Sequence, residues 1–367
     1  MDIVLCVTQD CQLRCTYCFA GRKTPKAMTA EVAKRAIDMA LREPGRPGST
    51  ERKVAFFGGE PLLEWDLIVE TVSYARGRGS FGGPPLHFGV TTNGLALNAA
   101  RLEFLKSQGF ALCFSFDGSR SAQEACRPFP DGASSFEATD RRLREALEVF
   151  PDLEAVTVVS PANVRFLAAS VSHLLERGVK KVVLNPDYFS SWSDEDLHAW
   201  RAAYEQVAAV FVERYRAGEA CFINILVVKI ITRIRGGYGP GERCDFGGCY
   251  AAVAPSGNIY PCQRSLNEDR GGPLCIGNVF DGLLRERKRA IHACQGACNP
   301  ACRGCALKAR CRNWCGCVNA ALSGDAATVP GVVCFHERMA IEAADRAANT
   351  LYSEENPAFM RTYYPGE

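Results

Sequence analysis

The sequence lacks the features that mark secreted, membrane-bound and nucleic-acid-binding proteins. Its 367 residues carry a formal net charge of only +2, without the basic surplus of a dedicated nucleic-acid binder. Met1 and Asp2 lead directly into an apolar run, so the basic and apolar regions of a signal peptide are missing. No apolar stretch approaches the ~20 residues that span a bilayer. We therefore expect a cytoplasmic protein that binds neither membranes nor nucleic acid.

Cysteine is scarce in one long part of the chain and abundant in two others. Four of the 19 cysteines lie in the first 18 residues, two lie between residues 19 and 220, and thirteen lie from Cys221 to Cys334. In a protein without a secretion signal, such cysteines are more often metal ligands than disulfides. The distribution predicts two metal-binding regions separated by a nearly cysteine-free body.

The first 190 residues alternate between short apolar runs and amphipathic patterns. We expect strands at residues 3–8, 53–57, 86–92, 111–116, 155–160 and 180–185. Helices are expected at residues 29–42, 64–76, 99–108, 135–149 and 164–177, with Thr29 as the N-cap of the first. Strands that alternate with helices imply a parallel sheet, either open and doubly wound or closed toward a barrel.

The unusual loops of this region all follow expected strands. The first cysteine-rich loop follows the first strand, and the other four are Gly58-Gly59-Glu60-Pro61, Thr92-Asn93-Gly94, Asp117-Gly118 and Asn185-Pro186-Asp187. The carboxyl ends of parallel strands meet on one face of a β/α barrel, whereas an open sheet has its site at one switch point. The loops therefore favour an α/β fold with a partial, TIM-like (β/α)6 barrel.

A chain of this length usually forms one large and one smaller domain. We expect the barrel over residues 1–190 and a helical or bridging region over 191–235. Within that region, 194–217 reads as a long helix and 221–234 as strand or bridging structure. A glycine-proline breaker then precedes a cysteine-rich domain over 236–335, and a helix from 336 to 350 with a polar tail completes the chain to residue 367.

Three cysteines near the amino terminus have the spacing of a cluster-binding motif. Cys11, Cys15 and Cys18 stand in the pattern C-x3-C-x2-C. A 4Fe–4S cluster usually takes four cysteine thiolates, so three on one loop leave one iron open. On these residues alone, a zinc site and three ordinary buried thiols are the alternatives.

The Gly-Gly-Glu-Pro tetrapeptide strengthens the cluster interpretation. Two glycines let the backbone approach a ligand closely, and the Glu60 carboxylate accepts hydrogen bonds from an ammonium group. Together the two motifs resemble those of the radical SAM superfamily, in which the open iron chelates S-adenosylmethionine (SAM) and the GGEP motif binds its amino group. The resemblance implies that SAM is reduced to methionine and a 5′-deoxyadenosyl radical.

The same resemblance implies further SAM contacts. Ser115 and a downstream arginine, with Arg127 as the candidate, are expected at the SAM carboxylate or ribose, and Leu184-Asn185 is expected at the adenine. The remaining expected contacts are Tyr17, Phe19, Gly58, Gly59, Glu60, Pro61, Thr92, Asn93 and Asp117. Without the resemblance, Ser115, Asp117 and Thr92 are equally typical of capped turns.

The carboxyl-terminal third has the most specific spacing in the chain. It contains C-x2-C-x5-C-x3-C from Cys302 to Cys315, and upstream Cys244 precedes Gly257 and Cys262. This pattern resembles the SPASM domain, which binds two auxiliary 4Fe–4S clusters, whereas the alternative is a pair of zinc ribbons. The resemblance implies three 4Fe–4S clusters, with auxiliary cluster I on Cys244, Cys249, Cys262 and Cys315 and auxiliary cluster II on Cys302, Cys305, Cys311 and Cys334. Cys298 or Cys317 could displace a neighbour as ligand.

The residue that follows Cys262 differs from the one found in a related group of enzymes. Anaerobic sulfatase-maturating enzymes resemble this architecture, but they carry an aspartate, which serves as a base, directly after the cysteine that corresponds to Cys262. Gln263 stands here instead, and an amide accepts no proton at neutral pH. The catalytic residues stay unknown, with Gln263 and Cys126, a thiol that could donate hydrogen, as candidates.

The resemblance predicts a radical SAM oxidoreductase that takes hydrogen from a ribosomally made peptide and forms an intramolecular C–C or thioether cross-link. Formylglycine formation and peptide epimerisation are the alternatives, and a non-catalytic zinc or iron–sulfur scaffold is the alternative of another class. Expected partners are a precursor peptide, an electron donor such as flavodoxin or ferredoxin, and a separate leader-binding protein. The last follows because the expected barrel starts at residue 3, without a fused leader-recognition domain.

Overall fold

The computed structural model describes residues 1–79, 83–239, 241–294 and 302–365. Cys298, one of the possible substitute ligands, lies outside these ranges. None of the helices within them is long and apolar enough to cross a membrane.

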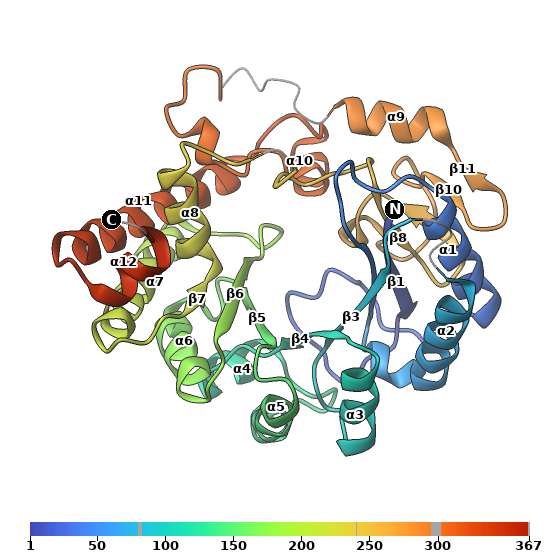
Figure 1. The fold of residues 1–367 in the computed structure, drawn as a ribbon, viewed down its shortest axis with the longest axis horizontal. Helices are drawn as coiled ribbons and strands as arrows, with labels where there is room; N and C mark the ends of the chain where they lie inside the picture. Colours follow the sequence, from blue (N-terminus) through green and yellow to red (C-terminus); the bar gives the residue numbers. More distant parts are fainter. Residues whose placement is uncertain (80–82, 240, 295–301, 366–367) are drawn as a thin grey trace.

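One eleven-stranded sheet runs through the described residues (Figure 1), in the order β11-β10-β9-β8-β1-β2-β3-β4-β5-β6-β7. All six predicted strands are present and parallel: β1 (Asp2–Thr8), β2 (Arg52–Gly58), β3 (Leu86–Thr92), β4 (Ala111–Ser115), β5 (Glu154–Val159) and β6 (Lys181–Pro186). A short β7 (Phe222–Ile223) extends the parallel sheet beyond β6. Since β7 and β11 each pair on one side only, the sheet stays open as a partial barrel.

The helices between these strands cover the outer face of the curved sheet (Figure 1). They are α1 (Ala30–Arg42), α2 (Trp65–Arg78), α3 (Ala99–Ser107), the short α4 (Arg120–Cys126), α5 (Phe136–Val149) and α6 (Leu167–Glu176). Thr29 caps α1 as predicted, because its side chain accepts a hydrogen bond from the backbone of Val32 at 3.3 Å. Alternate strand residues such as Leu5 and Phe56 point outward into the core beneath these helices.

The cysteine-rich region continues the barrel sheet. β8 (Tyr250–Val253) runs parallel to β1, and β9 (Asn258–Tyr260), β10 (Gly277–Asn278) and β11 (Gly282–Leu283) follow as antiparallel strands. Val4 and Cys6 on the inner face of β1 pack with Ala252 and Tyr260 in a second apolar cluster. The remaining helices of this region are α9 (Arg285–Ala293) and α10 (Gly316–Ser323).

The segment 221–234 is mainly helical, which corrects the expectation of strand or bridging structure. Only Phe222 and Ile223 form a strand, and α8 (Asn224–Ile234) follows at once. Its apolar residues repeat at helical spacing, so Ile225, Leu226 and Ile230 are buried where α8 packs against β6 and α11 (Gly331–Ser353). The long helix α7 (Asp194–Arg216) agrees with its prediction, whereas α11 begins at Gly331, ahead of the expected residue 336.

Short 3-10 turns and one terminal helix complete the described chain. The turns are η1 (Pro61–Glu64), η2 (Val164–Phe166), η3 (Gln263–Ser265) and η5 (Lys308–Arg310), and the terminal helix is α12 (Pro357–Tyr363). η1 begins directly after Glu60 and η3 directly after Cys262, so these two turns follow predicted site residues.

Candidate functional site

The predicted loops converge on one cavity at the carboxyl ends of the barrel strands. Its empty volume, counted to the open mouth, is about 1270 Å³. Most of the predicted site residues line it: Cys11, Cys15, Tyr17, Cys18, Phe19, Gly58, Gly59, Glu60, Thr92, Asn93, Ser115, Arg127 and Gln263. This is the face on which β/α barrels carry their active sites.

The cysteine loop is anchored at several points along its length. The Asp10 carboxylate accepts a 2.8 Å hydrogen bond from the backbone of Cys11. Further along, the amides of Arg14 and Thr16 each donate at 2.9 Å, to the carbonyls of Pro128 and Cys126. Cys126 therefore supports the loop through its backbone.

Several donors point at the thiol sulfurs of this loop. Cys11 Sγ accepts from the amide of Leu13 at 3.4 Å and from Asn93 Nδ2 at 3.7 Å, and Cys18 Sγ accepts from Lys23 Nζ at 2.8 Å. Burial raises the pKa of Cys11, and it raises that of Cys15 to about 11. Buried thiols with donors aimed at sulfur suit thiolates whose charge a metal centre compensates. The three residues thus fit the predicted 4Fe–4S cluster.

The two glycines of the second motif are required by the packing of the cysteine loop. Gly58 has a φ of +141°, and a Cβ there would lie 2.3 Å from the carbonyl oxygen of Thr8. A Cβ on Gly59 would lie 2.0 Å from the carbonyl oxygen of Asp10. Both contacts are impossible for a side chain, so the tetrapeptide is shaped to fit against the start of the cysteine loop.

Glu60 is held rigidly in the wall of the cavity. Its side chain is 1% exposed and accepts hydrogen bonds from Thr92 Oγ1 at 2.7 Å, from the amide of Asn93 at 2.8 Å and from the amide of Leu62 at 3.1 Å. Burial raises the pKa of Glu60, and these hydrogen bonds oppose the rise. Pro61 does not line the cavity, because it starts η1 beneath the wall.

Asp117, Tyr17 and Arg127 form a buried chain at the cavity wall. The Tyr17 hydroxyl donates to the Asp117 carboxylate at 2.7 Å and accepts from Arg127 Nη1 at 3.1 Å. Burial raises the pKa of Asp117 to about 6. Arg127 lines the cavity and is 6% exposed, yet its Nε has no hydrogen-bond partner in the described part of the chain. A buried donor of this kind fits an anionic ligand group such as a carboxylate.

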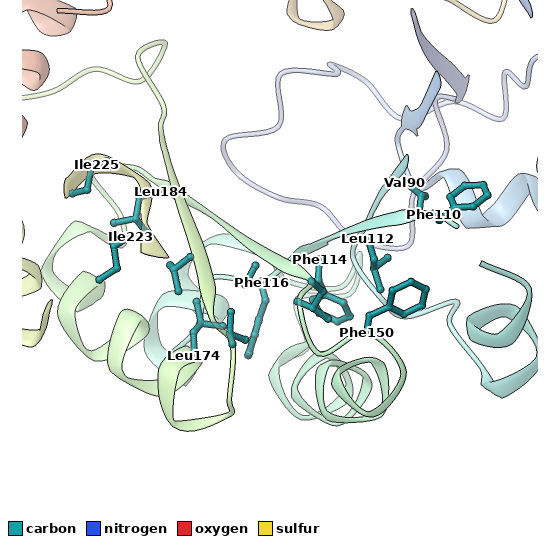
Figure 2. Close-up of a cluster of buried hydrophobic side chains, with 14 of the residues drawn as sticks. Val90, Phe110, Leu112, Phe114, Phe116, Phe150, Leu174, Leu184, Ile223 and Ile225 are labelled. Atoms are coloured by element: carbon teal, nitrogen blue, oxygen red, sulfur yellow. The ribbon is translucent and has the colours of Figure 1, made fainter. Parts of the chain in front are cut away.

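Besides Pro61 and Asp117, which do not line the cavity themselves, two further residues predicted at this site lie away from it. Leu184 points into the hydrophobic core beside Ile223 (Figure 2), and the next residue, Asn185, lines the cavity instead. Cys126 is fully buried, with its sulfur 3.5 Å from Ser160 Oγ, so its thiol does not face the cavity.

The cavity also contains residues that sequence reasoning passed over. Cys113, on β4, lines the cavity, and burial raises its pKa to about 11. Asp187 also lines it, which the unusual loop after the sixth strand had signalled. Lys23 and Arg264 add positive charge to the wall, and neither had a sequence signal.

A second, smaller cavity brings together the four cysteines predicted for auxiliary cluster II. Cys302, Cys305, Cys311 and Cys334 line a space of about 550 Å³. Glu337 lies on the same wall and forms a buried ion pair with Lys229 at 2.5 Å. Four thiols around one cavity fit a four-cysteine cluster.

The cysteines predicted for auxiliary cluster I are only partly gathered. Cys262 and Cys315 pack in one apolar cluster with Phe246 and Cys317, and the Cys315 thiol is close enough to Cys244 to help raise the pKa of Cys244. Cys249 lies apart from this group. No three His, Cys, Asp or Glu side chains in the described ranges converge as a single metal ion would require.

Comparison with protein families and relatives agrees with this geometry. Residues 5–164 match the model of the Radical SAM superfamily. An uncharacterized protein of Methanocaldococcus jannaschii, MJ0907, is 29% identical over a match that spans 49% of this chain and 60% of that protein. The radical SAM cyclopropyl synthase TigE of Paramaledivibacter caminithermalis is 23% identical over 85% of this chain and 67% of its own length. The PqqA peptide cyclase of Xanthomonas euvesicatoria is 25% identical over 98% of this chain and 94% of its own.

Two solved structures share the fold over most of the chain. Native anSMEcpe with bound AdoMet aligns with a TM-score of 0.80 and 18% identity, over 96% of this chain and 99% of that one. Streptococcus suis SuiB bound to its precursor peptide SuiA aligns with a TM-score of 0.64 and 15% identity, over 91% and 75%. The likeness confirms the expected fold class, with the barrel and the cysteine-rich region in one architecture.

Proposed function

We propose that this chain, which belongs to the radical SAM superfamily through its residues 5–164, is an enzyme that forms a cross-link within a ribosomally made peptide. Gln263 carries the proposal. It lines the same cavity as the three clustered cysteines, and its Oε1 accepts a hydrogen bond from the Tyr250 hydroxyl. That bond fixes the amide, so the position next to Cys262 offers no proton acceptor for formylglycine chemistry.

The chain's own residues divide the cavity into two parts. Cys11, Cys15 and Cys18 would hold the cluster, and Arg127 would bind the SAM carboxylate with its unpaired donor. Among the described residues, Glu60 Oε2 accepts a hydrogen bond only from the amide of Asn93. This oxygen would therefore accept a further hydrogen bond from the SAM ammonium group. When bound, the cluster and SAM would supply the chemistry that removes one hydrogen atom from the peptide, and the auxiliary clusters would supply a route for the electron that is released, with a proton lost to solvent, as the cross-link closes.

The other part of the cavity would receive the peptide. Asp187, Phe189 and Arg264 line it together with Gln263. Opposite charges beside an aromatic ring and an amide suit a peptide, which offers backbone donors, acceptors and side chains together. TigE is named a cyclopropyl synthase and the Xanthomonas enzyme a PqqA peptide cyclase. Both names describe the formation of a ring, which supports a cross-linking reaction for this chain.

The proposal includes cofactors and partners. Three 4Fe–4S clusters and SAM are its cofactors, with an electron donor such as flavodoxin or ferredoxin. SuiB, which binds its precursor peptide, supports a precursor peptide as the substrate here. We further propose a separate leader-binding protein as a partner that holds the peptide.

Mass spectrometry of candidate peptides tests the proposal. Short peptides encoded beside this gene would be incubated anaerobically with the reconstituted protein, SAM and a reductant. We expect a loss of two hydrogens per event and fragments that show two joined residues. A peptide whose mass is unchanged in ordinary water but includes one added deuterium in heavy water would indicate epimerisation. Cys113 would then be the thiol to mutate first. Protein that binds zinc and no iron would contradict the enzyme interpretation altogether.

Asp187 favours formylglycine formation as the second candidate function. Its carboxylate lines the cavity and accepts from the amide of Phe189 at 3.0 Å and from Ser190 Oγ at 2.5 Å. A positioned carboxylate could replace the base that Gln263 lacks. Conversion of a sulfatase-type peptide to an aldehyde by the wild type, lost in Asp187→Asn, would establish this function. We expect no aldehyde from either protein.

A further inference from the structure

Three cysteine side chains, those of Cys262, Cys315 and Cys317, pack together beside the main cavity, and Cys244 lies near enough to Cys315 for the two thiols to interact electrostatically. Cys262, Cys315 and Cys317 pack against Phe246 in one apolar cluster, and the sulfurs of Cys315 and Cys317 are 3.8 Å apart. Three of the four are ligands predicted for auxiliary cluster I. The fourth predicted ligand, Cys249, is absent from the group.

Cys249 lies in the turn that leads into β8, apart from this group. Tyr250, the first residue of the strand, turns its side chain to the inner side, where its hydroxyl donates to Gln263. The backbone of Cys249 is fixed there, since its amide donates to the Asp245 carboxylate and its carbonyl accepts from the amide of Asp2 at 2.9 Å.

The charged groups that act most strongly on the Cys249 thiol are Asp245, Lys288, the amino terminus and Arg46. In contrast, those that act most strongly on Tyr250, on the inner side, are the thiols of Cys262, Cys6, Cys244 and Cys317. The thiols that could share one cluster are therefore those of the inner face.

Cys317 reaches this group because of the glycine before it. A Cβ on Gly316 would lie 2.4 Å from the ring of Phe246, so only glycine lets the start of α10 press against that ring. Cys315 caps α10 and Cys317 lies in its first turn. The tight Cys-Gly-Cys segment turns both thiols to the same side, toward Cys262.

We infer that Cys317, rather than Cys249, is the fourth ligand of auxiliary cluster I, together with Cys244, Cys262 and Cys315. The inference rests on the auxiliary clusters of the proposed function and assigns one of them. Each thiol loses its proton when it binds iron. Because Gln263 follows Cys262 and lines the main cavity, this ligand set places the cluster directly behind the cavity wall.

Iron and sulfide analysis of single variants tests the assignment. Anaerobically reconstituted wild type should bind about 12 irons per chain, and Cys317→Ala should bind about 8. Cys249→Ala should keep about 12, as should Cys221→Ala, a matched control whose thiol lies beside β7 outside both cysteine groups. Loss of iron in Cys249→Ala with full iron in Cys317→Ala would overturn the assignment.

In a variant that lacks one ligand, the three remaining thiolates could still hold the cluster, and the iron content would then stay unchanged. Electron paramagnetic resonance of the reduced protein detects the altered cluster in that case. Exchange of a ligand sulfur for oxygen alters the g values and the potential of that cluster. Cys317→Ser should therefore change one of the cluster signals, and Cys249→Ser should leave all of them unchanged. A changed signal in Cys249→Ser, or an unchanged one in Cys317→Ser, overturns the assignment while the proposed function stands. Wild-type protein that binds no more than about 4 irons per chain would contradict both the ligand assignment and the proposed function.

Discussion

The backbone amide of Glu60 donates a 2.7 Å hydrogen bond to the carbonyl oxygen of Asp10. Asp10 immediately precedes Cys11, so this bond ties the carboxylate motif after β2 to the cysteine motif after β1. The neighbouring amide of Gly59 makes a second tie, to the carbonyl oxygen of Thr8 at 2.8 Å. The cysteine loop and the Gly58–Pro61 loop therefore form one unit, which explains why both glycines are needed.

Gly59→Ala should separate the two motifs. The added Cβ would overlap the carbonyl oxygen of Asp10, so the cysteine loop has to move and its cluster is lost. We expect the iron content to fall from about 12 to about 8 per chain, with no measurable SAM binding. Gly45→Ala is the control, because its Cβ meets nothing within 4 Å. Full iron and normal SAM binding in Gly59→Ala would show that the loops are independent.

Glu60→Gln should weaken SAM binding at least tenfold while the clusters remain. Hydrogen bonds to charged groups contribute about 1.5–3 kcal/mol, which corresponds to roughly a tenfold or larger change in affinity. In addition, the new amide would turn an NH₂ group toward one of the donors that now bond Glu60. Calorimetric titration with SAM measures the effect, with the exposed Glu103→Gln as control. Unchanged affinity would reduce Gly58–Pro61 to a structural turn.

Changing Cys11, Cys15 and Cys18 together to alanine should remove one cluster of three. About two-thirds of the iron should remain, and production of 5′-deoxyadenosine from SAM should cease. The cysteines of the carboxyl-terminal cavities lie on other elements, so their iron should be unaffected. A variant that still cleaves SAM would show that the open iron is elsewhere.

Much of the fold could be predicted because apolar runs and unusual loops alternate strictly through the first half of the chain. The six strands follow from this pattern, and Gly58–Pro61 and the cysteines reach one cavity because all their strands point the same way. Segment 221–234 was misread, since a short apolar run does not distinguish a buried helix from a strand. Only its packing against α11 decides the matter.

Individual side chains were harder to place than the loops. Leu184 and Asn185 are neighbours in one strand and face opposite sides of the sheet, so an error of one position puts the wrong residue in the cavity. Cys126 ends the short helix α4 and turns its thiol to Ser160, whereas Cys113 on β4 faces the cavity. Long-range contacts such as that of Tyr17 with Asp117, 100 residues apart, have no local signal at all.

Asp117 should make stability depend on pH. Its pKa is about 6 in the folded chain against an ordinary 3.8, so the folded state holds its proton more tightly than the unfolded state. The free energy of unfolding is therefore highest below the ordinary pKa and falls as the pH rises through about 6, by at most about 3 kcal/mol.

Asp117→Asn isolates this contribution, because asparagine does not titrate. Between pH 5 and 7.5, the stability of the variant relative to wild type should rise by about 1 kcal/mol, measured from thermal unfolding under anaerobic conditions. Asp152→Asn, at an exposed ion pair with Lys180, should show no such trend. A constant difference across this range would mean that Asp117 is ionised throughout.

Lys229 should be the most costly charge to remove outside the cavity. Its Nζ donates to Glu337 at 2.5 Å and to the carbonyl of Arg310 at 2.9 Å, and both members of the ion pair are almost fully buried. Against the effect of burial, the hydrogen bond with His336 and the charge of Lys229 hold the pKa of Glu337 far below its ordinary value. Lys229→Met removes the ammonium partner of that buried carboxylate and leaves it, among the residues that the structure describes, only the Arg312 amide and His336, which should cost about 3–5 kcal/mol of unfolding free energy.

The double variant Lys229→Met/Glu337→Leu separates the charge effect from packing. A buried ion pair replaced by apolar residues of similar size is often neutral or even stabilising, so most of the lost stability should return. Lys34→Met, which breaks an exposed pair with Glu70, should change stability by no more than about 1 kcal/mol. Urea unfolding under anaerobic conditions measures all three. If the double variant is as unstable as Lys229→Met, then the lysine acts through its bonds to Arg310 and Tyr238 and not through its charge.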